Sequence, residues 1–202
     1  MARTTRCTFC SILLLVTMVL LLSPLSGCPA TTSMTNGGGP CDLGKLIASD
    51  GAPFDNLGAS ISISGNVAVI GAPGTETPAS GFANVYRFDG TNWLEEARLA
   101  ASDNIPFDAF GSSVSISGDA VVIGARIAGL TAYVYRFDGT EWIEEATLTP
   151  LDFASSDAVG PPVSVSGDAV VIGTNGDGSA YVYRFDGTNW LEEARLAASD
   201  AT

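Results

Sequence analysis

A block of 19 residues recurs three times along this chain of 202 residues, and the recurrence limits the fold more than any other feature. The stretch Val85–Asp103 (VYRFDGTNWLEEARLAASD) returns without change at Val182–Asp200, and a close variant fills Val134–Asp152. The second residue of each block is a tyrosine, and these tyrosines lie 49 and then 48 residues apart. A period of this size is typical of stacked supersecondary units that bury their apolar faces against each other.

Each repeat contains four segments with the pattern of short β-strands. The first alternates branched residues with serine, and the second is continuously apolar. Glycine beside Asn or Asp separates these two, and Asp-Gly follows the third; both are hairpin signals. The fourth begins at a tryptophan and carries two glutamates, as suits an exposed edge strand. In the first repeat the four segments are Ala59–Ser64, Val67–Ile70, Val85–Phe88 and Trp93–Leu99.

These units predict an all-β protein. Because the second strand is apolar on both sides, it must be covered on both sides, which favours sheets packed face to face in series. We therefore predict a partial β-propeller of three four-stranded antiparallel blades, an incomplete six- or seven-bladed ring, with a β-sandwich or an irregular β-solenoid as alternatives. The repeat region is 45–202, with blades at about 54–103, 104–152 and 153–200. Residues 45–50 match the end of a fourth strand and form a stray outer strand.

Short glycine motifs recur at one spacing inside the repeats. Each repeat has an apolar residue followed by glycine, and a second glycine comes 13 residues after the first. The three instances are Leu57-Gly58 with Gly71-Ala72-Pro73, Phe110-Gly111 with Gly124-Ala125, and Val159-Gly160 with Gly173. The pattern resembles the FG-GAP repeat of integrin α-subunit β-propellers and of bacterial surface proteins, and the resemblance implies a β-propeller. Calcium-binding members carry an acidic loop between the first two strands. Here that loop is only Ser-Gly-Asn or Ser-Gly-Asp, so no metal site is expected.

The first residues have the pattern of an export signal. Two arginines precede Ile12–Leu22, which is apolar except for Thr17 and too short to span a bilayer as a helix. Leu25-Ser26-Gly27-Cys28 resembles the lipobox of bacterial lipoproteins, which implies a signal peptide at 1–27 and acylation of Cys28. Residues 28–44 are then a flexible tether. The alternative is an ordinary secretory signal with a chance cysteine.

Composition narrows the chemistry. The net charge is −13 and the chain has no histidine, so nucleic-acid binding is excluded and the commonest general base and metal ligand are missing. Three pairs of adjacent glutamates recur, but neighbours on a strand point to opposite faces, so we interpret them as solubilising edge charges. Aspartates five residues apart in the inter-blade loops are interpreted as turn caps. We predict no catalytic residue, no cofactor and no metal ligand. The glutamate pairs are Glu95-Glu96, Glu144-Glu145 and Glu192-Glu193, and the aspartate pairs are Asp50/Asp55, Asp103/Asp108 and Asp152/Asp157.

The sequence therefore favours an exported, lipid-anchored envelope protein whose repeats form a non-catalytic binding or scaffolding module for a protein or glycan ligand. Pro29 is not the aspartate linked to inner-membrane retention, which favours the outer membrane or cell surface. A glycan-active or other hydrolytic propeller enzyme and a truncated repeat fragment are the alternatives. Three blades are too few to close a ring, so a homodimer that closes the propeller and a capping partner both stay open.

Overall fold

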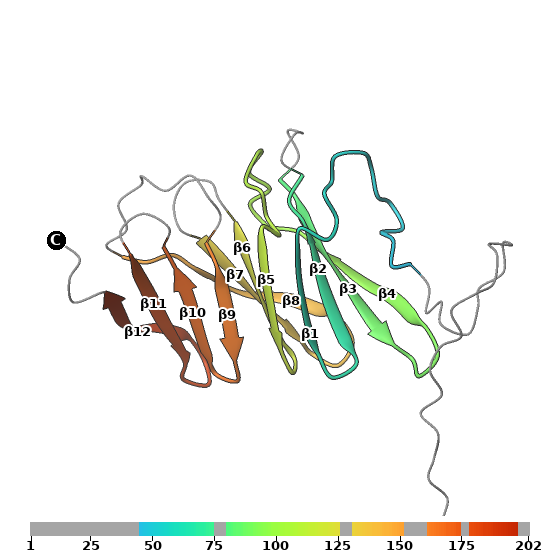
Figure 1. Cartoon of the computed structure of the whole chain (residues 1–202). Helices are drawn as coiled ribbons and strands as arrows, with labels where there is room; N and C mark the ends of the chain where they lie inside the picture. The colour runs from blue at the N-terminus through green and yellow to red at the C-terminus, as the bar shows by residue number, and fades with distance from the viewer. Residues whose placement is uncertain (1–44, 75–79, 126–130, 152–160, 175–177, 198–202) are drawn as a thin grey trace, which may run out of the picture. The chain divides into compact units, whose positions relative to one another are not determined.

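The computed structural model describes residues 45–74, 80–125, 131–151, 161–174 and 178–197, and these form three four-stranded sheets (Figure 1). The strands are β1 (Ser60–Ser64), β2 (Val67–Ala72), β3 (Phe82–Phe88), β4 (Trp93–Leu99), β5 (Ser113–Ser117), β6 (Ala120–Ala125), β7 (Thr131–Phe137), β8 (Trp142–Leu148), β9 (Val163–Ser166), β10 (Ala169–Gly173), β11 (Ser179–Phe185) and β12 (Trp190–Ala197). Sheets β1–β4, β5–β8 and β9–β12 are called blades 1, 2 and 3.

Each blade is an antiparallel meander in which sequence neighbours pair, β1-β2-β3-β4 in the first. The turn between the first two strands holds a glycine with positive φ in every blade: 59° at Gly65, 61° at Gly118 and 58° at Gly167. Only glycine adopts this conformation without strain, which is why the Ser-Gly-Asn/Asp signal marks the hairpin. The predicted all-β architecture of three four-stranded antiparallel blades is confirmed.

The hairpin between the last two strands is held by its aspartate. The carboxylate of Asp89 accepts hydrogen bonds from the backbone N–H groups of Thr91 and Asn92, at 2.8 and 2.7 Å. Asp138 and Asp186 do the same in the other blades. Because these bonds favour the charged carboxylate, they lower the pKa of all three aspartates. The Asp-Gly signal therefore reflects side-chain caps as well as glycine geometry.

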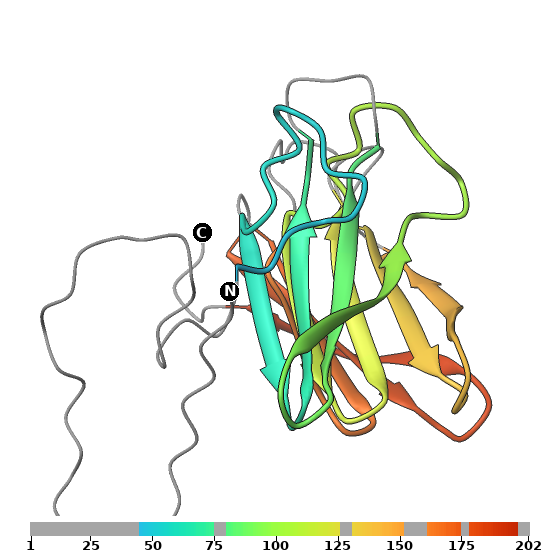
Figure 2. The ribbon, with the colours of Figure 1, turned by 90° about the vertical axis from the view of Figure 1, so that its right-hand side faces the viewer.

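The first strands of the three blades lie side by side, with β5 between β1 and β9. The fourth strands β4, β8 and β12 form the opposite edges of the blades (Figures 1 and 2). Every residue of β6 is buried, because blade 2 is covered by blade 1 on one side and blade 3 on the other. In β2 and β10 buried residues alternate with half-buried ones, so the described residues cover blades 1 and 3 on one side only.

Residues 45–50, predicted as a stray outer strand, form no regular strand. They nevertheless bind blade 1 as the residues after β4 bind blade 2. The backbone N–H and hydroxyl of Ser49 donate to the Glu95 carboxylate at 2.7 and 3.1 Å, and Ser102 donates to Glu144 in the same way at 3.1 and 2.8 Å. The match to the repeat therefore extends to the contacts of this segment, although no strand among the described residues pairs with it.

Candidate binding faces

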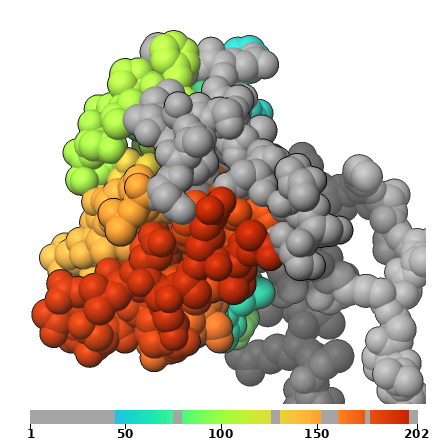
Figure 3. All heavy atoms as spheres, turned by 90° about the vertical axis from the view of Figure 1, so that its left-hand side faces the viewer, coloured from blue at the N-terminus to red at the C-terminus, as the bar shows by residue number. Residues whose placement is uncertain are grey.

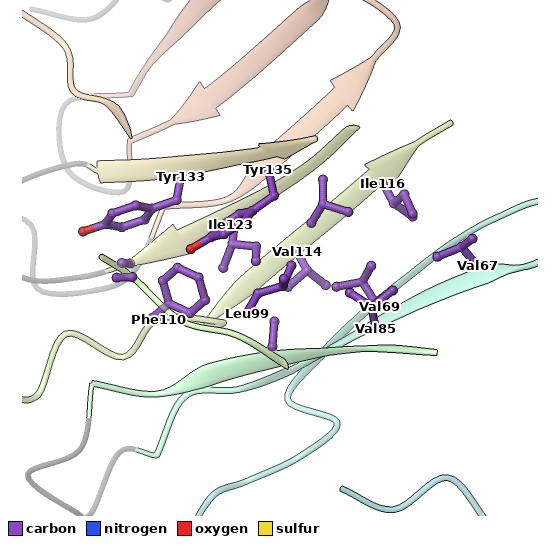
Figure 4. Close-up of a cluster of buried hydrophobic side chains, with 14 residues drawn as sticks. Val67, Val69, Val85, Leu99, Phe110, Val114, Ile116, Ile123, Tyr133 and Tyr135 are labelled. Carbon is purple, nitrogen blue, oxygen red and sulfur yellow. The ribbon is translucent and has the colours of Figure 1, made fainter. Parts of the chain in front are cut away.

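The interface between blades 1 and 2 shows how a covered blade face is built. Valines of β2 and β3 meet branched residues of β5 and β6 in one buried cluster (Figure 4). Phe110 enters this cluster from the loop before β5 and is completely buried. Its ring lies 5.3 Å from that of Tyr133 and 6.2 Å from that of Tyr135. These three aromatic side chains therefore contribute to the packing between blades 1 and 2.

Glycines let the backbones of adjacent blades approach closely. Gly111 has a φ of 89°, and a Cβ atom there would strike the carbonyl oxygen of Phe82. A Cβ on Gly71 would in turn strike the carbonyl oxygen of Gly111. The Phe-Gly motif of blade 2 therefore packs directly on the Gly-Ala-Pro motif of blade 1. Larger residues at these two positions would separate the blades.

The FG-GAP repeat matches residues 42–86, 93–135 and 142–183 of the chain, and these ranges include both of these motifs. The chain belongs to the FG-GAP repeat family. Its fold is also similar to the crystal structure of Saccharomyces cerevisiae Sqt1, with a TM-score of 0.49 and 11% sequence identity. That similarity covers 72% of this chain and 37% of Sqt1. No curated protein matches the chain.

The glutamate pairs of this FG-GAP array bond across the blade interfaces. The first glutamate of each pair accepts from the segment that precedes its blade, as Glu144 does from Ser102. The second accepts from the tryptophan of the following blade: Trp142 donates to Glu96 at 2.7 Å, and Trp190 to Glu145 at 2.9 Å. The pairs lie on the outermost strands, as the interpretation of edge charges requires, and the structure adds that they bond across the blade interfaces. The recurrence of the glutamates close to a tryptophan in every repeat indicated a shared role. The sequence could not show which residues bond to them, because the partners belong to neighbouring blades.

An arginine of the same blade forms an ion pair with the second glutamate of each pair. Arg87 forms a two-pronged ion pair with Glu96, and its guanidinium lies 5.0 Å from the ring centre of Phe137 in blade 2. Arg136 stands in the same relation to Glu145 and to Phe185 of blade 3. Hydrogen bonding by the Arg87 guanidinium lowers the pKa of Glu96 more than partial burial raises it, so this carboxylate is charged at neutral pH.

Serines of the first strands add a third kind of link. The hydroxyl of Ser62 accepts from the backbone N–H of Ile116, and that of Ser64 from Gly118, both at 3.1 Å. Ser115 and Ser117 form the same bonds with Val165 and Gly167 of blade 3, at 3.1 and 3.2 Å. The serines that alternate with branched residues in the sequence therefore link neighbouring blades and fix the register between them.

Blade 1 carries an uncovered apolar face, which we call the leading face and define by Ile61, Ile63, Ala68 and Ile70. Ile61 is 73% exposed and Ile63 is 63% exposed. With Leu46, these side chains line an apolar hollow of about 380 Å³. The equivalent residues of blade 2 are buried against blade 1, so the leading face has the composition of an interface without a neighbouring blade.

Blade 3 carries the opposite uncovered face, the trailing face, defined by Ala169, Val171, Val182 and Ala194. All four side chains are half-buried. Their equivalents in blade 2 belong to the cluster that packs on blade 3. Ser164 and Ser166, the equivalents of the bridging serines, are exposed beside this face. The two open faces are thus the two different sides of one repeated interface.

A smaller hollow lies where the loops before blades 1 and 2 meet β3 and β4. Its volume is about 220 Å³, and Asp55, Arg98 and Asn104 are among the residues that line it. In the loops before blades 1 and 2, two equivalent phenylalanines adopt left-handed backbone angles, Phe54 at φ 74° and Phe107 at φ 63°, with side chains 61% and 53% exposed. Exposed aromatics in this strained region are uncommon, which marks these loops as a second surface available for contacts.

The predicted aspartate pairs of the loops are joined to protein groups. The Asp55 carboxylate accepts from the N–H of Ala52 at 2.6 Å, which is a turn cap, and Asp50 pairs with Arg98. Asp103 accepts from the hydroxyl of Tyr133 at 2.7 Å, and Asp108 is buried. No group of three or more metal-ligating side chains occurs among the residues that the structure describes.

Several predicted features lie outside the described residues. They are the signal peptide 1–27, the lipidation site Cys28, the tether 28–44, the pair Asp152/Asp157 and the motif Val159-Gly160. Within the described part of the chain, no helix has the length and apolar character needed to cross a membrane.

Proposed function

We propose that this FG-GAP protein is an exported, lipid-anchored binding module of the bacterial cell envelope and that it has no catalytic activity. The observation that carries the binding role is the leading face, where two isoleucines are more than half exposed on a rigid sheet. Isolated exposed apolar residues are ordinary, whereas an apolar hollow on a sheet face is typical of an interaction surface.

The anchor is supported by the sequence of residues 12–28 alone. An acyl chain contributes about 0.8 kcal/mol per buried methylene, so a diacylglycerol and a further chain on Cys28 would hold the protein at the membrane. The test is growth with a labelled fatty acid. The chain should take up label and fractionate with membranes, and the Cys28→Ser variant should do neither. Membrane fractionation without label would refute acylation.

The non-catalytic role is supported by what the acidic residues already do. Glu96 and Glu145 are held by an arginine and a tryptophan at blade interfaces, so they are not available to flank a substrate bond. The chain also has no histidine to act as general base at neutral pH. Turnover of any glycoside or ester by the purified protein would overturn this part of the proposal.

The binding role is tested with the leading face itself. The exported protein should capture an envelope protein or glycan, and Ile63→Asp should lose that capture because a charge is placed on the apolar surface. Leu151→Asp is the matched control, since Leu151 is 93% exposed and belongs to neither open face. Equal capture by both variants would show that the leading face is not the binding surface.

A further inference from the structure

We propose that the leading and trailing faces bind each other between two copies of this chain, so that two three-bladed arrays close head to tail into a six-bladed ring. This inference rests on the proposed binding role and names the partner of the leading face. It follows from the internal repeats, because the interface has two examples inside each copy, between blades 1 and 2 and between blades 2 and 3.

The apolar parts of the two faces correspond to the two sides of those internal interfaces. On the trailing side, Val171 and Val182 repeat Val69 and Val85, which are completely buried against blade 2. On the leading side, Ile63 repeats Ile116, which is 6% exposed between blades 1 and 2. A second copy would therefore place valines of β10 and β11 on isoleucines of β1, as blade 1 does with blade 2 (Figure 3 shows the blade 3 side).

The polar groups also correspond. Inside the array, the tryptophan of one blade donates to the second glutamate of the preceding blade. At the open faces, the equivalent tryptophan is Trp93 of blade 1 and the equivalent glutamate is Glu193 of blade 3. Among the described residues, the indole N–H of Trp93 meets no carboxylate, and Glu193 pairs with Arg184 of its own blade. Arg184 in turn is the equivalent of Arg136, which lies over Phe185, so its expected ring in the second copy is Phe88.

The serine register is present on both sides. Ser164 and Ser166 are exposed and hold the places of the hydroxyls that accept from the next blade. The matching donors on blade 1 are the backbone N–H groups of Ile63 and Gly65, which repeat Ile116 and Gly118. Space for close approach exists as well, because a Cβ on Gly58, the equivalent of Gly111, would meet nothing within 4 Å.

The geometry of the contact limits the assembly. Leading and trailing faces are different surfaces, so the association is heterologous and forms either a closed ring or an open filament. Propellers close with about four to eight blades. Two copies give six, and three copies would give nine, so the dimer is the closed state that three-bladed copies can reach.

One segment of the acceptor copy already occupies part of this interface. Ser49 holds the Glu95 carboxylate, and Leu46 lines the leading hollow at the place that repeats Leu99. Leu196 of the incoming copy is also equivalent to Leu99, so the two leucines compete for one position. Shortening the chain after Arg195 should therefore strengthen association.

The experiment uses two differently tagged copies of the full chain, produced together, exported and purified in detergent, with capture through one tag. Wild-type copies should capture each other and sediment at twice the mass of one copy. Ile63→Asp in both copies, or Val171→Asp in both, should reduce capture at least about a hundredfold, because an unpaired carboxylate would be buried. Combining an Ile63→Asp copy with a Val171→Asp copy should restore capture, since one leading face and one trailing face remain intact.

Three controls make each result decisive. Circular dichroism shows that both variants fold, Leu151→Asp should leave capture unchanged, and Cys28→Ser should do so too if capture does not reflect shared micelles. Monomeric wild-type copies, or a mixed pair that fails to associate, would overturn head-to-tail pairing. If wild-type copies stay apart while Ile63→Asp still abolishes capture of another envelope component, the proposed binding role stands and self-association falls.

Discussion

The repeats place the same isoleucine in two environments, which allows burial energy to be measured inside one protein. Ile116 of β5 and Ile63 of β1 occupy the same place in their strands, but Ile116 is 6% exposed and Ile63 is 63% exposed. Replacing isoleucine with alanine removes three carbon groups, worth about 2.4 kcal/mol when fully buried at about 0.8 kcal/mol each.

The exposures convert this value into two different costs. Ile116→Ala should lose nearly all of the transfer energy and leave a cavity, for a total of about 3 kcal/mol. Ile63→Ala should lose roughly a third of the transfer energy and leave no enclosed cavity, so its cost is about 1 kcal/mol. With a urea slope of about 1.5 kcal/mol per molar, the midpoints should fall by about 2 M and about 0.7 M.

Urea unfolding followed by tryptophan fluorescence measures both variants, because each blade contains one tryptophan. The protein should be dilute enough to keep copies apart. Free energies within about 0.5 kcal/mol of each other would refute the assignment of Ile63 to an uncovered face. If copies associate as proposed, the cost of Ile63→Ala should rise toward that of Ile116→Ala as concentration increases.

Three further experiments, with five substitutions, test the links between blades. Trp142→Phe should cost about 1 kcal/mol in urea unfolding, because it removes a hydrogen bond to a carboxylate, whereas Trp93→Phe should cost less than about 0.5 kcal/mol at low concentration. Gly111→Ala should lower the thermal midpoint far more than Gly118→Ala: both have positive φ, but only the first would drive a Cβ into the neighbouring backbone. The pKa of Glu96 is lower in the folded protein than in the unfolded chain, so its contribution is complete above about pH 4.3 and is lost as pH falls below that value. Glu96→Gln should therefore make stability less dependent on pH between 5 and 3, as measured by urea unfolding at each pH.

The contribution of the sequence is clearest at the level of one blade. Strand order, hairpins and the apolar second strand follow from alternation and from Gly-Asn, Gly-Asp and Asp-Gly turns, since these are local preferences of the backbone. The Phe-Gly and Gly-Ala-Pro motifs also pointed to their family before any contact was known. The role of these motifs depends on tertiary structure, because Gly111 of blade 2 packs against Gly71 of blade 1.

The hydrogen-bond partners of the charged side chains could not be predicted from the sequence, for a physical reason. Glu96 belongs to blade 1, and the donor that holds it, Trp142, lies 46 residues later in blade 2. Strand alternation describes which way a side chain leaves its own sheet, but it contains no information about the sheet stacked above. The register between blades set these partners, and that register depends on serine hydroxyls and glycine contacts acting together.

The amino-acid sequence thus determined the three all-β units, their turns and their family, because each of these depends on residues close together along the backbone. Only the tertiary arrangement decided which faces are covered. Val122 and Val171 are equivalent in sequence, yet the first is completely buried and the second is half-buried, since burial depends on whether another blade packs on that side.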